Sequence, residues 1–192
     1  MTKYLLSFNG PIQEKQTNAL RDRIAQVLEQ KDYQSLIVLF SSTGGRSTDG
    51  LSLYNFLRSL PRPIQFHAVG SIESMAVPVF CGAHKRTCSP ITRFSFHTYS
   101  WGGFEGGQSY DRILEAAQKL KNEIDLSRKI VEDNTRIPAD KLAALFRPTA
   151  EPTIFSAQEA KQFGLVEAVE EINPSGATQS DTVMWTVNWP SP

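Results

Sequence analysis

Three separated segments of the chain contain residue types that could perform acyl-transfer chemistry. Ser74 lies in "GSIESMA", residues 70–76, a small-residue turn between an apolar run and an apolar helical stretch. His97 lies in "RFSFHTY", residues 93–99, at the end of a strand-like segment. A serine hydroxyl becomes a nucleophile at neutral pH when a base such as histidine takes its proton. Ser74 is therefore a candidate nucleophile, and His97 is a candidate for its base.

The third segment, "SSTGGRS" at residues 41–47, is a candidate oxyanion hole. It directly follows an apolar strand-like run, and its paired glycines let backbone N–H groups turn toward a bound oxygen. The N–H of Met75 is a second candidate donor, because the first N–H groups of a helix have no intrahelical partner. Each of these segments alone is more often structural, and their combined order along the chain is what favours chemistry. His67, in the middle of a strand, and His84, in a basic loop, are the competing bases.

These segments are positioned by alternating strand and helix patterns. A parallel sheet with right-handed crossovers is expected from this alternation, with the catalytic segments at the carboxyl ends of its strands. The run "SLIVLF" is continuous enough for a strand buried on both faces. Expected strands cover 3–8, 35–40, 64–70 and short segments near 85–90 and 92–99, and expected helices cover 13–30, 48–60 and the stretch after Ser74.

The second half of the chain has a long helical pattern over residues 110–134, apolar on one side and charged on the other. A two-faced helix of this length is expected to serve self-association. Two short helices follow at 138–146 and 156–164, the second with Ser156 as N-cap, and then a closing strand at 165–172. We expect one domain over 1–172 and a mobile tail over 173–192, whose apolar end either adds a strand to a neighbour or packs locally.

Composition excludes several classes of protein. The 192 residues hold 20 basic and 20 acidic side chains, so neither nucleic acid nor an anionic membrane is an expected partner. No apolar run approaches the length of a membrane span, and the expected location is the cytoplasm. Cys81 and Cys88 are too few for a disulfide framework or a zinc site, so no metal and no cofactor are expected.

The segments together resemble the Clp protease proteolytic subunits, within the wider ClpP/crotonase superfamily. That family's Ser-Pro-Gly-Gly motif is matched by "SSTGGRS", and its Gly-x-x-x-Ser-Met turn by "GSIESMA". Its histidine is matched by His97, 23 positions after Ser74, and its closing motif by "SAQEAKQFGLVEAV". The resemblance covers about residues 3–172 and implies an α/β fold of spiral β-β-α units with a protruding handle helix at about 110–134.

The resemblance also implies a serine endopeptidase that cleaves peptides or unfolded chains and assembles with itself into rings or stacked rings. Carried over to this sequence, Ser74 is the nucleophile, His97 the general base, and the N–H groups of Gly45 and Met75 the oxyanion hole. The strand that leads into the handle loop would bind extended substrate by β pairing.

Two departures from the family pattern qualify these expectations. The family's third catalytic residue, an aspartate four positions before the closing Ser-Ala, is replaced here by Pro152, which has no side-chain acceptor. Glu151 is the best substitute, and a backbone carbonyl or a water is the runner-up. In addition, family members usually carry an N-terminal segment that engages a partner ATPase, whereas the first expected strand here begins at about Lys3. Usual coupling to a Clp ATPase is therefore not expected.

Two other readings remain besides a serine peptidase with an atypical third residue and reduced activity. A catalytically impaired or non-catalytic ring or adaptor subunit would keep the fold and oligomer, and Pro152 supports it. A crotonase-type acyl-CoA enzyme would keep the oxyanion hole but would not need the Ser74–His97 pair.

Overall fold

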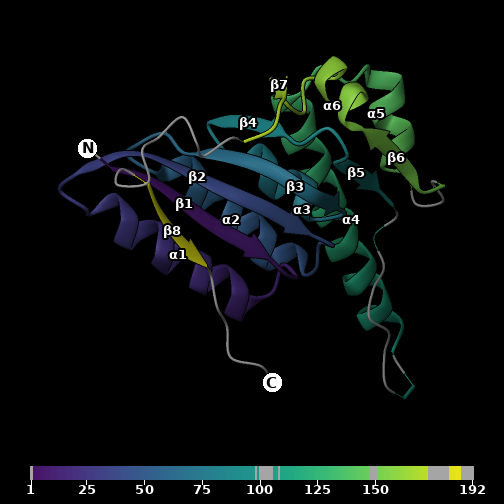
Figure 1. The fold of residues 1–192 in the computed structure, drawn as a ribbon. Coiled ribbons are helices and arrows are strands. Elements are labelled where there is room, and N and C mark those ends of the chain that lie inside the picture. The colour runs from purple at the N-terminus through teal and green to yellow at the C-terminus, as the bar shows by residue number, and fades with distance from the viewer. Residues whose placement is uncertain are drawn as a thin grey trace.

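A single twisted sheet with its main helices on one face organises the chain in the computed structural model (Figure 1). The structure describes residues 2–97, 99, 106–107, 109–147 and 151–172, and the backbone of 182–186. The sheet has eight strands in the order β6-β5-β3-β2-β1-β8, and β4 pairs with β3 and β7. The strands are β1 (Thr2–Asn9), β2 (Tyr33–Ser42), β3 (Gln65–Glu73), β4 (Lys85–Cys88), β5 (Arg93–Phe96), β6 (Thr153–Ser156), β7 (Ala168–Val169) and β8 (Thr182–Thr186).

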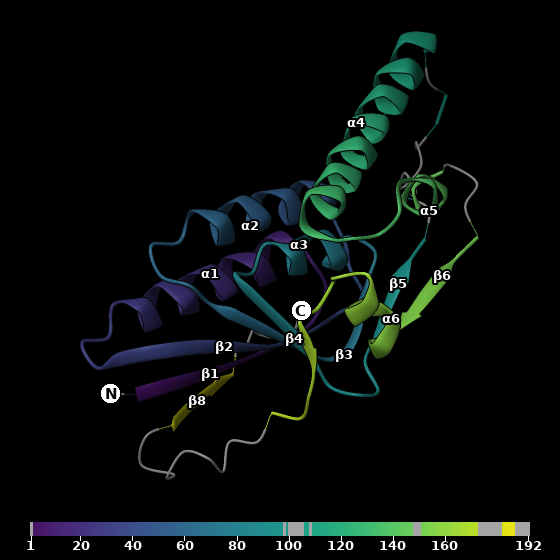
Figure 2. The same cartoon turned by 90° about the horizontal axis from the view of Figure 1, so that it is seen from above.

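Helices α1, α2 and α3 cover the same face of this sheet, as Figure 2 shows from above. Leu20, Ile24 and Val27, which recur at helical spacing along α1, are buried there. All six residues of α3 are buried, so this short helix lies in the centre of the core. The helices are α1 (Glu14–Leu28), α2 (Ser47–Ser59), α3 (Ala76–Cys81), α4 (Tyr110–Asn134), α5 (Ala139–Leu145) and α6 (Ala157–Gln162).

A row of phenylalanine rings runs through the core between the sheet and these helices. Successive rings from different elements lie within van der Waals reach, and such aromatic pairs contribute about 0.5–1.5 kcal/mol each beyond the area they bury. The row therefore fixes β1, β2, β3, α3 and β5 relative to one another. Its ring centroids are 5.2 Å apart for Phe8–Phe40, 5.0 Å for Phe40–Phe66, 6.3 Å for Phe66–Phe80 and 5.5 Å for Phe80–Phe94.

Most predicted elements are confirmed, with corrections at the sheet edges. The β2 strand is buried only on its helix side, because its other face, with Ile37 and Leu39, is half-exposed. The predicted closing strand is reduced to β7. Sequence reasoning missed β6, which pairs antiparallel with β5 and makes the sheet mixed. The predicted cap at Ser156 is confirmed as a capping box with Glu159.

Part of the predicted tail joins the sheet. Strand β8 pairs in parallel with β1, with Leu5 opposite Met184, so the apolar end of the chain packs locally. It covers the outer edge of β1, which would otherwise offer unpaired N–H and C=O groups. The mobility predicted for residues 173–181 falls outside the described part of the chain.

Helix α4 has the predicted bounds and projects from the body of the molecule (Figure 2). Its buried residues, Ser127, Ile130 and Val131, all lie in its second half. Its first half is solvent-exposed and keeps large apolar side chains there, with Tyr110 73% exposed and Ile113 and Leu114 each 49% exposed. None of the helices in the described ranges is both long and apolar enough to cross a membrane.

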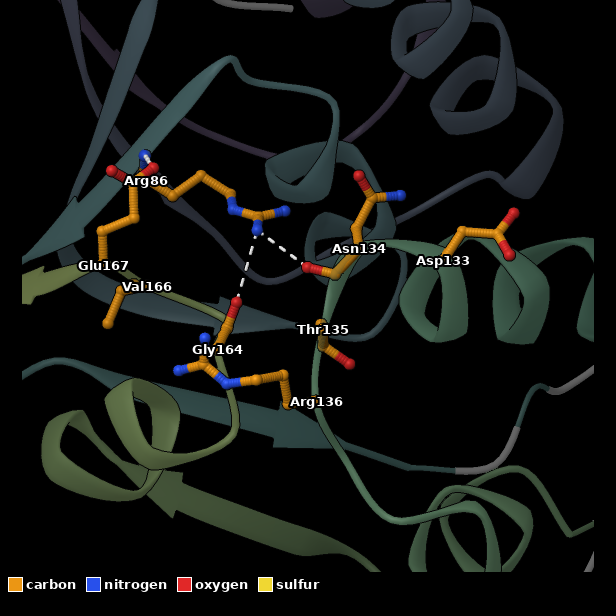
Figure 3. Close-up of a pocket in the computed structure, with 8 residues that line it drawn as sticks. All are labelled: Arg86, Asp133, Asn134, Thr135, Arg136, Gly164, Val166 and Glu167. Carbon is orange, nitrogen blue, oxygen red and sulfur yellow. Dashed lines mark hydrogen bonds between the residues drawn. The ribbon is translucent and has the colours of Figure 1, made fainter.

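The base of α4 is fastened by Arg86 of β4, as Figure 3 shows. The Arg86 guanidinium donates to the carbonyl oxygens of Asn134 at 2.8 Å, Gly164 at 3.3 Å and Cys81 at 3.4 Å. These three carbonyls belong to the ends of α4 and α3 and to the loop after α6. Arg86, Asn134 and Gly164 also border a pocket of about 530 Å³, and the exposed Arg136 lies across it (Figure 3).

We predict that Arg86→Met lowers the free energy of unfolding by about 2–3 kcal/mol, because charged hydrogen bonds to partly buried carbonyls are lost together. Arg136→Met removes an arginine from the same pocket and is the matched control, expected to change stability by less than about 0.5 kcal/mol. Urea denaturation followed by circular dichroism measures both. Equal effects of the two substitutions would contradict the anchoring role of Arg86.

Candidate active site

Ser74 lies in a strained turn at the carboxyl end of β3. Its φ is +52°, and it is the one residue other than glycine with positive φ in the described chain. The left-handed conformation costs an L-residue about 1–2 kcal/mol, so the surrounding structure must hold it. The Ser74 N–H donates to the carbonyl of Ser95 in β5 at 2.9 Å, and the Ser74 carbonyl accepts from the Val77 N–H at 3.0 Å. The turn is thereby fixed to a neighbouring strand on one side and to α3 on the other.

The glycine loop predicted as an oxyanion hole lies directly against this turn. Gly44 has φ +85°, and a Cβ placed on it would lie 2.7 Å from the Glu73 carbonyl oxygen, 2.8 Å from the Ser74 Cβ and 3.1 Å from the Met75 N. Any side chain at this position would displace the serine. Glycine is therefore required at position 44 both by its backbone conformation and by the closeness of the Ser74 turn.

Gly45 is held by an isolated parallel bridge to Ile12. The Ile12 N–H donates to the Gly44 carbonyl and the Arg46 N–H donates to the Ile12 carbonyl, both at 2.8 Å. In a parallel bridge the flanking residues make the bonds, so the N–H of Gly45 itself points away from Ile12. A Cβ on Gly45 would lie 2.3 Å from the Ile12 carbonyl oxygen, which again requires glycine.

Sequence reasoning did not identify Ser42 as part of this loop. Ser42 is only 2% exposed, and its hydroxyl accepts a hydrogen bond from the Gly44 N–H at 3.1 Å. This hydroxyl holds the start of the glycine turn while the Ile12 bridge holds its end. The signal was available in the "SSTGG" segment, because serine hydroxyls commonly bond the backbone two residues on.

The sheet register brings the segment of His97 to the same edge as Ser74. Strand β3 pairs in parallel with β5, with Glu73 opposite Ser95, so residues after Glu73 and after Phe96 leave neighbouring strands in the same direction. His97 is the first residue after β5 and is half-buried, as is Ser74. The competing histidines are placed differently. His67 is fully buried, with its ring nitrogens 2.7 Å from the Thr87 Oγ1 and 3.0 Å from the Ser89 Oγ, and the His84 Nδ1 accepts from the Ile64 N–H at 3.4 Å.

The register of β5 with β6 locates the position of the expected third residue. Phe96 lies opposite Thr153 in this antiparallel pair, so one further step brings position 152 across from His97. That position is Pro152, and Glu151 lies one residue beyond it; both are exposed and precede the first residue of β6.

The strand that leads into the handle loop was predicted to bind extended substrate by β pairing. This strand is β5, and other strands already occupy both of its edges over most of its length. Residues Arg93–Ser95 pair with β3 on one side, and residues Arg93–Phe96 pair with β6 on the other. A substrate strand would therefore have to pair beyond Phe96, where the chain is described only at residues 97 and 99 before position 106.

The described residues contain no group of three or more His, Cys, Asp or Glu side chains suited to a metal ion. Cys81 and Cys88 are both buried and unpaired by disulfide, and burial raises the pKa of the Cys88 thiol to about 11. Their thiols are consequently protonated at neutral pH and do not act as nucleophiles.

Comparison with known proteins supplies the family. The sequence profile of the Clp protease family matches residues 2–173. The chain is also 28% identical, over 167 residues, to the ATP-dependent Clp protease proteolytic subunit of Pleurastrum terricola, an alignment that covers 86% of this chain and 82% of that protein. The predicted α/β class and the predicted family are thus confirmed. The chain belongs to the Clp protease family, whose members are serine peptidases that form homo-oligomeric rings.

Proposed function

We propose that the protein is a serine endopeptidase that cleaves peptides or unfolded chains through an acyl-enzyme, without the usual coupling to a Clp ATPase. The observation that carries this proposal is the left-handed turn of Ser74, which is hydrogen-bonded to Ser95, two residues before His97. Strained backbone at a residue other than glycine persists where surrounding contacts enforce it, and such residues concentrate at functional sites.

In the proposed reaction, the Ser74 oxygen attacks a peptide carbonyl carbon while His97 accepts the hydroxyl proton. The C–N bond of the tetrahedral intermediate then breaks, and His97 returns the proton to the leaving amine. Water attacks the resulting ester by the same route and restores the free hydroxyl. Within the protein, Ser74 and His97 are the groups that change protonation state in these steps.

The negative oxygen of the intermediate is assigned to the N–H groups of Gly45 and Met75. Support comes from the orientation of the Gly45 N–H away from Ile12 and from the closeness of Gly44 to the Met75 N. Backbone N–H donors held this firmly need little reorganisation as charge develops, which is why removing one such donor typically costs about 100-fold to 1000-fold in rate.

The group that orients His97 is assigned to Glu151. Position 152 is the one the register brings opposite His97, and Pro152 offers no side-chain acceptor there. Glu151 is the adjacent carboxylate and lies outside the regular strand geometry of β6, so its side chain is not bound to one face of the sheet. Because this carboxylate is exposed, its hold on the imidazole is expected to be weak and the turnover low.

Self-association is proposed to involve the projecting half of α4. Tyr110, Ile113 and Leu114 form an exposed apolar stripe at helical spacing, and a second copy of the chain could cover it. Self-association through α4 agrees with the formation of homo-oligomeric rings by members of the family.

Hydrolysis of fluorogenic peptides and of unfolded casein, measured without any ATPase, tests the proposal. The wild-type chain is expected to cleave both, and Ser74→Ala is expected to lower kcat/KM by at least about 1000-fold with unchanged folding. Ser71→Ala, in the same strand but before the turn, is the matched control. Cleavage that survives Ser74→Ala would remove Ser74 from the mechanism.

The third residue is tested by Glu151→Gln and Pro152→Asp. We expect Glu151→Gln to lower kcat by about tenfold, because the amide cannot stabilise an imidazolium as a carboxylate does. Pro152→Asp should raise kcat by at least about tenfold, since it places a carboxylate at the register position opposite His97.

Steady-state kinetics on both variants and on their double mutant measure these changes. A kcat unaltered by Glu151→Gln would exclude Glu151 as the orienting group. A kcat unaltered by Pro152→Asp would show that this position does not face the imidazole.

A second candidate function is a ring or adaptor subunit with impaired turnover or none. Pro152 favours it, because the residue at the position facing His97 has no side-chain acceptor. The two candidates differ in outcome, since a non-catalytic subunit would still self-associate through α4 but would not cleave peptides.

A further inference from the structure

One buried hydroxyl lies where α4 passes the candidate site. Ser127 is fully buried, and its Oγ lies 3.8 Å from the Met75 Sδ, a hydrogen bond to sulfur. A serine buried in the middle of a helix needs partners for its hydroxyl, because an unsatisfied one costs about 1–3 kcal/mol. The sulfur of Met75 supplies a weak acceptor for the Ser127 hydrogen.

The second partner of Ser127 is the phenol of Tyr99. The two side chains are hydrogen-bonded, and burial raises the pKa of the Tyr99 phenol to about 12, so the phenol is neutral at neutral pH. The ring is also fixed by stacking on Phe146, at 6.5 Å between centroids. These contacts form one chain that runs from Tyr99 through Ser127 to Met75.

Both ends of this chain belong to the segments that carry the chemistry. Met75 directly follows Ser74, and Tyr99 lies two residues after His97. The side chain of Met75 is held from the other side by α2, where a Cβ on Gly50 would lie 2.4 Å from its Cγ. A displacement of Ser127 would therefore also displace the Ser74 turn, through Met75, and the segment of His97, through Tyr99.

We propose that Ser127 is a positioning residue, which sets the distance between the Ser74–Met75 turn and the His97 segment by bonding Met75 and Tyr99 together. The inference rests on the proposed peptidase function. Ser127 touches neither the substrate nor the reacting atoms, and it acts by keeping the nucleophile and the base in register. Misplacement of about 1 Å can cost on the order of 100-fold in rate, so a loss of about tenfold is expected when one link is removed.

The test compares Ser127→Ala, Tyr99→Phe and their double mutant by steady-state kinetics and thermal unfolding. Each single variant is expected to lower kcat about tenfold at unchanged KM. It should also lower the melting temperature, because one buried polar group loses its partner. The double variant removes both polar groups, so its melting temperature should recover toward the wild-type value while its kcat stays low.

A purely structural role would make kcat and the melting temperature recover together in the double variant. A melting temperature that recovers while kcat stays low therefore supports the positioning role. If kcat returns together with stability in the double variant, the positioning role is wrong. Controls are Ser59→Ala, which removes an exposed helix hydroxyl bonded to the Phe56 carbonyl, and Tyr33→Phe, which removes a phenol bonded to the Pro63 carbonyl. Both are expected to keep the wild-type kcat. If Ser127→Ala does not fold, Tyr99→Phe and the double variant give the same decision.

A readout independent of activity separates this inference from the proposed function. The chain has three methionines, so the methyl resonance of Met75 can be followed by 13C-methyl NMR and assigned by its loss in Met75→Leu. The resonance should shift in both Ser127→Ala and Tyr99→Phe and stay in place in the two controls. If the wild-type chain cleaves no peptide, the peptidase proposal fails, and an unmoved Met75 resonance would separately overturn the link through Ser127.

Discussion

The conformation of one residue, the left-handed Ser74, constrains the rest of the site. Its φ of +52° is unfavourable for serine and is imposed by contacts from three separate parts of the chain. The Ser95 carbonyl accepts its N–H, and its own carbonyl accepts the Val77 N–H of α3. Gly44 packs so closely against it that a Cβ at position 44 would lie 2.8 Å from the Ser74 Cβ. Moving any one of these elements would let the turn relax and would carry the serine hydroxyl out of the edge where His97 leaves β5.

The wider fold serves this constraint by fixing those elements relative to one another. The phenylalanine row ties β1, β2, β3, α3 and β5 into one core, and the Ile12 bridge ties the glycine loop to the first crossover. Arg86 fastens the base of α4 to the ends of α3 and of the α6 loop. Helix α4 therefore has two parts with different roles, a buried base that borders the site and an exposed half with an apolar stripe.

Sequence patterns predicted the elements whose signal is local. The spacing of apolar residues located α1 and α4, and the Ser156 cap marked the start of α6. Strand β6 was missed because four residues hold too little periodicity, and its antiparallel sense depends on how the chain returns after α5. The order of the motifs predicted Ser74 and His97 as candidate catalytic residues. The backbone strain at Ser74 could not be predicted in this way, because it depends on neighbours distant in sequence. Ser127 was overlooked although its spacing from Ile130 and Val131 places it on the buried stripe of α4.

Ser74 is proposed to be a nucleophile whose reactivity depends on His97. Reaction with a fluorophosphonate, followed by intact mass and peptide mapping, measures this without any assumption about the natural substrate. The wild-type chain is expected to gain one phosphonyl group on Ser74, while Ser74→Ala gains none and His97→Ala reacts at least about 100-fold more slowly. Absence of an adduct in the folded wild-type protein, or equal rates for the wild type and His97→Ala, would contradict the claim.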